Sequence, residues 1–165
     1  MSSPAELLDD AARLHRCMEP LGAALGQAPY EVQRAGVARR ARRLGSAPIG
    51  YKVALTSPAT QAALGTDQPA IGRLLAADVL PSGSTVALDR MFSPVLEAEL
   101  VFRVREDLPV HAAPEQIARA CEVAAGLECP DSRYADWFGG AYPVLGLDDV
   151  IADNCLTGLV VVGDT

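Results

Sequence analysis

The sequence contains little histidine and no paired cysteines, and these shortages exclude several kinds of site. The only histidines are His15 and His111, in unrelated contexts, so one chain cannot build a histidine-rich zinc or iron site. None of the four cysteines stands in a Cys-x-x-Cys pair, which argues against a zinc knuckle or a thioredoxin-like site. We interpret the cysteines as small buried hydrophobic residues in a reducing compartment. Any metal would be held by oxygen ligands, which favours magnesium or manganese.

Long apolar runs and excess positive charge are also missing. No apolar stretch approaches the length of a membrane span, and the N-terminus shows no basic start followed by an apolar segment. We therefore expect a cytoplasmic protein with no membrane partner. The formal net charge of −7 disfavours nucleic acid as a partner. Neither a Gly-x-Gly-x-x-Gly motif nor a Walker loop supports a nucleotide-binding fold.

The hydrophobic pattern predicts helices first and mixed strands afterwards, which is typical of the α+β class. Half of the 165 residues are hydrophobic, enough for a buried core. We divide the chain into an N-terminal helical region, 1–48, and a mixed-β region, 49–165, which the resemblance given below implies to be the first part of a catalytic core. The expected elements are helices over 4–18, 30–44, 58–64, 114–125 and 147–152, strands over 49–55, 85–88, 95–104, 126–129 and 156–162, and a loop over 66–83.

Lysine occurs once, at Lys52, whereas 13 residues are arginine. Arginine and lysine differ where a compact ammonium with an adjustable pKa is needed. Lys52, on the expected strand 49–55, is therefore a candidate for chemistry. A surface lysine left over from a compositional bias is an equally good explanation of this count alone.

Three glutamates form a candidate metal site. Strand alternation places Glu97 and Glu99 on one face, roughly 7 Å apart. Two converging carboxylates repel each other, and a divalent cation between them removes that conflict. Glu-x-Glu alone is as well explained by a solvent-facing strand edge. Glu128 adds a third carboxylate in the apolar stretch 124–130, where glutamate is rarely buried unless it is paired or bound to metal.

Several short motifs together carry a family resemblance. In chain order they are residues 50–57, residues 64–69 with Gly72, residues 97–99, residues 127–133 and residues 152–154. This series resembles the fumarylacetoacetate hydrolase superfamily, in its branch of 2-keto-4-pentenoate (2-hydroxypenta-2,4-dienoate) hydratases and 4-oxalocrotonate decarboxylases. The similarity covers most of residues 30–162 and implies a core of the fumarylacetoacetate hydrolase type.

The resemblance also assigns roles. It implies a hydratase, a lyase that depends on a divalent metal and adds water to a short 2-hydroxydienoate or 2-keto-enoate in aromatic-compound catabolism. In the family the metal chelates the carboxylate and the 2-oxo oxygen of the substrate, which stabilises the enolate. The implied residues are Glu97, Glu99 and Glu128 as ligands of Mg²⁺ or Mn²⁺, Lys52 as the active-site lysine, and Leu64, Asp67 and Gln68 in the region that closes over the substrate.

Two departures from the family pattern leave the reaction open. Many hydratases have an acid where this chain has Ala70, and a small hydroxyl residue where it has Leu156, followed here by Thr157. A related 2-keto acid decarboxylase or hydrolase is therefore the alternative. The family also continues through a β-rich C-terminal half, so the sequence resembles a truncated member. We accordingly expect low stability, self-association into a homo-oligomer through unpaired strand edges, or an inactive fragment that needs another chain.

Overall fold

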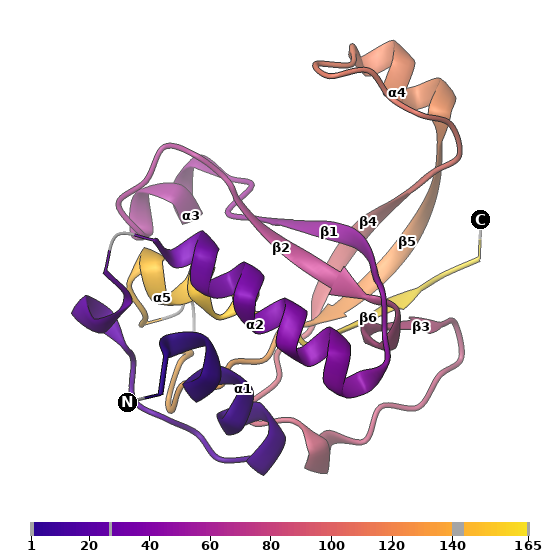
Figure 1. Cartoon of the computed structure of the whole chain (residues 1–165). Helices are drawn as coiled ribbons and strands as arrows, with labels where there is room; N and C mark the ends of the chain where they lie inside the picture. The colour runs from indigo at the N-terminus through magenta and orange to yellow at the C-terminus, as the bar shows by residue number, and fades with distance from the viewer. Residues whose placement is uncertain (1, 27, 140–143, 165) are drawn as a thin grey trace.

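The computed structural model describes residues 2–26, 28–139 and 144–164 and has the predicted α+β class. Two helices come first, followed by an antiparallel strand pair and a four-stranded mixed sheet (Figure 1). The helices are α1 (Pro4–Leu14), α2 (Pro29–Leu44), α3 (Pro58–Ala63), α4 (Pro114–Ala120) and α5 (Leu147–Ala152). The strands are β1 (Pro48–Ala54), β2 (Ala70–Leu75), β3 (Val79–Pro81), β4 (Glu97–Val104), β5 (Cys121–Cys129) and β6 (Leu159–Val162). None of the described helices is both long and apolar enough to cross a membrane.

The first helices follow their local sequence signals. Ser3 forms a capping box at the start of α1, accepting a hydrogen bond from the Glu6 amide while the Glu6 carboxylate accepts one from the Ser3 amide at 2.8 Å. The helix ends at Leu14, and the next residue, His15, caps it with a left-handed φ of 50°, so the predicted helix over 4–18 was too long. Helix α2 confirms the prediction over 30–44 and ends at Gly45, also left-handed.

Strand pairing decides which side chains meet. Strand β1 pairs with β2 in antiparallel register, which sets Lys52 opposite Gly72. The larger sheet has the order β3-β6-β5-β4. Antiparallel pairing of β4 with β5 sets Glu97 opposite Glu128, and this hairpin reaches away from the rest of the molecule with α4 at its far end (Figure 1).

Three predicted elements were wrong. The expected loop over 66–83 contains β2 and β3, because pairing with distant strands stabilises segments that are short or broken by glycine. The expected strand over 85–88 is irregular backbone up to residue 87, and Leu88 begins a short 3-10 helix. The helix expected over 114–125 ends at Ala120, and β5 begins at Cys121 instead of at residue 126. The apolar residues of 121–125 have a periodicity that fits a helix or a strand equally well. They form a strand because they pair with β4.

The main core joins the N-terminal helices to the last third of the chain. Leu8 of α1 and Leu25 pack in one buried cluster with Tyr134, Trp137 and Val150. Helix α2 is joined to both the strand pair and α5, because the buried Gln33 amide donates to the carbonyls of Ile71 and Ile151. The division at residue 48 stays a prediction.

Candidate functional site

The register of β4 and β5 brings the three glutamates together. Glu97 and Glu99 alternate onto one face of β4, and Glu128 stands directly opposite Glu97 on β5. One carboxylate oxygen from each residue lies within 4.8 Å of the other two. The predicted convergence of these carboxylates is therefore present in the structure, while their role as ligands stays a prediction.

Glu128 differs from its two neighbours because it is buried. It lies on a central strand, between β4 and β6, and is only 4% exposed, whereas Glu97 and Glu99 are exposed. Burial raises the pKa of the Glu128 carboxyl above its usual value, and the charges of Glu97 and Glu99 add to the rise. Lys52 opposes that rise.

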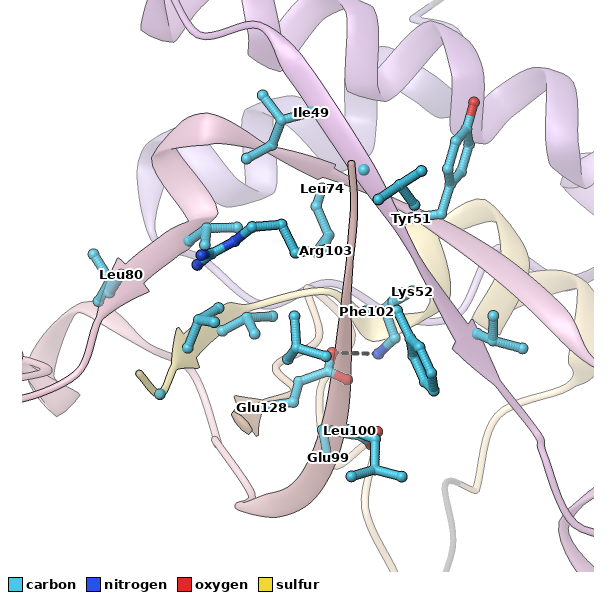
Figure 2. Close-up of a pocket in the computed structure, with 18 of the residues that line it drawn as sticks. Ile49, Tyr51, Lys52, Leu74, Leu80, Glu99, Leu100, Phe102, Arg103 and Glu128 are labelled. Atoms are coloured by element: carbon cyan, nitrogen blue, oxygen red, sulfur yellow. Dashed lines mark hydrogen bonds and ion pairs between the residues drawn. The ribbon is translucent and has the colours of Figure 1, made fainter. Parts of the chain in front are cut away.

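Lys52 approaches the carboxylates from the other sheet. It extends from β1, and its ammonium forms an ion pair with Glu128 between the two sheets (Figure 2). The same nitrogen donates to the backbone carbonyl of Cys155 at 3.0 Å. The Lys52 side chain is only 10% exposed, so this ammonium neutralises the buried negative charge of Glu128. The alternative that Lys52 is an ordinary surface residue was wrong.

Gly126 makes room beside Glu99. It stands opposite Glu99 in the ladder, and a Cβ atom at this position would lie 2.6 Å from Val101 Cγ2 and 3.7 Å from Glu99 Cβ. Glu99 is therefore not crowded by a cross-strand side chain. Three convergent carboxylates form a donor set that fits a hard divalent cation.

A cavity of about 1550 Å³ lies between the strand pair and the larger sheet. Lys52, Glu99 and Glu128 contribute to its lining, together with apolar side chains such as Phe102 (Figure 2). In the described part of the chain, the predicted substrate-closing residues are not among those that line it. Leu64 packs against the main core, and Asp67 and Gln68 are exposed in a turn. Their substrate role stays a prediction.

The Cys155 carbonyl is the part of the site that sequence reasoning missed. No sequence pattern reports a backbone oxygen, and the conformation that aims it is left-handed. The thiol of Cys155 is buried, which raises its pKa to about 12 and makes it a poor nucleophile. The expectation of buried cysteines holds for Cys129 and Cys155, whereas Cys17 is exposed.

Comparisons with known proteins give sequence relatives that match most of the chain. No family model matches the chain. The chain is 34% identical to the TodF product hydratase of Pseudomonas putida, over 98% of this chain and 60% of the relative. It is 36% identical to a 2-hydroxypent-2,4-dienoate hydratase of Pseudomonas putida, over 74% and 55% of the two chains. It is 38% identical to 2-keto-4-pentenoate hydratase 1 of Dechloromonas aromatica, over 70% and 42%.

Solved structures give the same fold. The chain superposes with a TM-score of 0.82 and 24% identity on 4-oxalocrotonate decarboxylase from Pseudomonas putida G7 complexed with magnesium and adipate, covering 97% of this chain and 60% of that one. The complex of that decarboxylase with calcium and acetate gives a TM-score of 0.80. The chain thus spans about three fifths or less of the length of these proteins. The predicted resemblance is confirmed: this chain is similar in sequence to 2-keto-4-pentenoate hydratases and shares the fold of 4-oxalocrotonate decarboxylase.

Proposed function

We propose that this chain carries the metal-binding and lysine part of a hydratase, a lyase that adds water to a short 2-hydroxydienoate or 2-keto-enoate in the cytoplasmic breakdown of aromatic compounds. The observation that carries the proposal is the convergence of Lys52, from one sheet, with three carboxylates from the other. The sequence relatives named as hydratases support it.

The glutamates provide the place for a cation and the lysine provides a mobile proton. Glu97, Glu99 and Glu128 would hold Mg²⁺ or Mn²⁺, whose positive charge would attract the carboxylate and the neighbouring oxygen of an acid substrate. Lys52 Nζ is held beside them by Glu128 and by the Cys155 carbonyl. An ammonium fixed there can orient the substrate anion and give or take a proton at its own nitrogen.

The walls of the cavity support a small, partly apolar acid as the substrate. Apolar side chains of β1 and β4 line the cavity together with charged groups, among them Lys52, Glu99 and Glu128 and the guanidinium groups of Arg73 and Arg103. A conjugated chain of a few carbons with a carboxylate at one end matches this distribution of polarity.

The test is loss of the ultraviolet absorbance of a conjugated 2-hydroxydienoate, measured with Mg²⁺, with Mn²⁺ and with EDTA. We expect metal-dependent loss that Glu99→Gln reduces at least tenfold. The matched control is Glu115→Gln, on the exposed first turn of α4 and outside the cavity. Release of carbon dioxide would show the related decarboxylase instead. Absence of both reactions in a folded protein that binds Mn²⁺ would contradict the proposed activity.

We also propose that the protein works as a homo-oligomer. Several large apolar side chains on β1 and β4 are more than half exposed, among them Ile49, Leu100 and Phe102. Apolar patches of this kind favour association. Light scattering of the purified protein tests this, and a monodisperse monomer at micromolar concentration would contradict it.

A further inference from the structure

Three consecutive residues next to the site have left-handed backbone. The φ angles of Asn154, Cys155 and Leu156 are 54°, 52° and 59°. Among residues with a side chain, asparagine accepts this conformation most readily, and it normally occurs as a single residue. Such strain persists only where the surrounding structure imposes it, and it clusters at functional sites.

Hydrogen bonds at both ends hold this turn in place. The Asn154 side chain accepts from the Arg73 amide and donates to the Arg73 carbonyl, each at 2.8 Å, as a neighbouring strand would. On either side of the turn, the Arg133 guanidinium is ion-paired with the buried Asp153 and donates to the Thr157 carbonyl at 3.0 Å. The turn is therefore fastened to β2 on one side and to the core on the other.

The fastened turn presents a backbone oxygen to the lysine. The Cys155 carbonyl accepts a hydrogen bond from Lys52 Nζ at 3.0 Å. This contact uses the backbone and not the buried thiol of Cys155. The direction of that carbonyl follows from the left-handed backbone, so the turn decides where the ammonium finds its acceptor.

Gly72 provides the path for the lysine side chain. It stands opposite Lys52 in the β1–β2 pair. A Cβ atom at this position would lie 2.8 Å from Lys52 Cγ and 2.7 Å from the Asn154 carbonyl oxygen. Both distances are shorter than Cβ contacts in real proteins. The Asn154 oxygen belongs to the backbone, which can move away less easily than a side chain. Glycine thus lets the lysine stem and the turn lie against the same strand position.

We infer that the left-handed turn and Gly72 form a seat for Lys52, and that Asn154 and Gly72 are positioning residues for its ammonium. This inference deepens the proposed function and rests on it only where turnover is concerned. The position of the lysine is measurable without any activity. A purely structural turn would contribute stability and leave Lys52 unaffected.

The single lysine makes the test direct, because protein labelled with ¹³C,¹⁵N-lysine shows the side chain of Lys52 alone. In the whole chain we expect inequivalent methylene protons and a nuclear Overhauser contact from the Lys52 stem to the Gly72 Hα. Gly72→Ala and Asn154→Ala should abolish the contact or shift these signals. The matched control is Gly36→Ala, in α2, where an added Cβ meets nothing within 4 Å.

Circular dichroism confirms that each variant folds. If an alanine variant does not fold, the Asn154→Gly variant replaces it in the test. Glycine accepts the left-handed backbone, so the fold is kept while both hydrogen bonds of the Asn154 side chain are lost. The Asn154→Gly variant should still shift the nuclear magnetic resonance signals of Lys52. In active protein, kcat of the folded variants should fall about ten- to hundredfold, with KM changed far less. Lys52 spectra identical to wild type in the folded variants would overturn the inference. An inactive wild type with the expected spectra would overturn the proposed function and leave the seat supported.

Discussion

Replacing Lys52 by methionine removes the positive charge closest to the buried carboxylate. Methionine keeps much of the apolar stem and loses the ammonium that pairs with Glu128. The two side chains are 10% and 5% exposed, so water compensates little of this loss. The remaining charges of the cluster, those of Glu97 and Glu99, repel the Glu128 carboxylate and worsen its position.

The expected cost is about 3–5 kcal/mol of unfolding free energy near pH 8, the range measured when one partner of a buried ion pair is removed. A domain of ordinary stability has about 5–15 kcal/mol in total. Lys52→Met should therefore lower the urea midpoint by a large fraction at that pH. Replacing both partners, as in Lys52→Met/Glu128→Gln, should recover most of the loss because no buried charge is left unpaired.

The loss should shrink as the pH falls. The pKa of Glu128 in the folded protein is raised, chiefly by burial, and without Lys52 it rises further. The folded carboxyl then binds its proton more tightly than the unfolded one. Its contribution to stability is fully present below the ordinary pKa of glutamate and is lost as the pH rises through the raised value, at up to about 1.4 kcal/mol per pH unit.

Urea unfolding followed by fluorescence of the only tryptophan, the buried Trp137, measures this at pH 5 and pH 8 in EDTA. The matched control is Arg105→Met, which breaks an ion pair to Glu122 between two largely exposed side chains. It should leave the midpoint nearly unchanged. An equal loss at both pH values, or a double variant no more stable than Lys52→Met, would refute the assignment of the cost to an unpaired buried carboxylate.

Three further outcomes are expected. Arg133→Met should cost about 3–5 kcal/mol in urea unfolding, because it leaves the buried carboxylate of Asp153 without its cation. Gly126→Ala should weaken Mn²⁺ binding in calorimetry, because the added Cβ would lie 2.6 Å from Val101 Cγ2 and displace the strand that carries the carboxylates. Lys52→Arg should slow turnover of the dienoate although it keeps the charge, because the guanidinium is bulkier and does not release a proton. A Lys52→Arg variant with the wild-type rate would show that no proton transfer at this residue is needed.

Local sequence signals were enough to predict the helices whose ends carry capping residues. Ser3 and Glu6 specify the start of α1, and Gly45 ends α2, without help from distant residues. Alternation alone was also enough to place Glu97 and Glu99 on the same face of β4.

Local sequence signals did not predict which strands pair when the strands are distant in the sequence. Strand β2 was expected to be part of a loop because turn residues lie on both sides of it, at 67–69 and 81–83, and its pairing with β1 is not visible in the sequence. Its Gly72 is the residue that the Lys52 stem requires. The position of Glu128 opposite Glu97 depends on the register of the β4–β5 hairpin, whose connection includes α4. From the sequence, Glu128 was expected beside Glu97 because of the family resemblance, since strand periodicity does not report which strands pair.

The Cys155 carbonyl lies beyond sequence reasoning altogether. Asparagine at 154 is compatible with a left-handed residue, but cysteine and leucine after it argue for ordinary backbone. Tertiary hydrogen bonds, such as those between Asn154 and the backbone of Arg73, impose the conformation. Local preference fails where distant contacts override it, as it does at this turn.

The shared core of Leu8, Leu25, Tyr134 and Val150 affects how the protein assembles during its synthesis. A helix as short as α1 is marginal in water without a partner for its apolar face. That partner is made more than a hundred residues later, which at about 5–20 residues per second takes roughly 5–25 s. During this interval α1 can pack only on α2 and on residues near Leu25, and the part of its apolar face that meets Tyr134 and Val150 stays uncovered. The nascent chain is therefore a ready client for chaperones that hold apolar segments, until the segment around Tyr134 and Val150 emerges and covers that face.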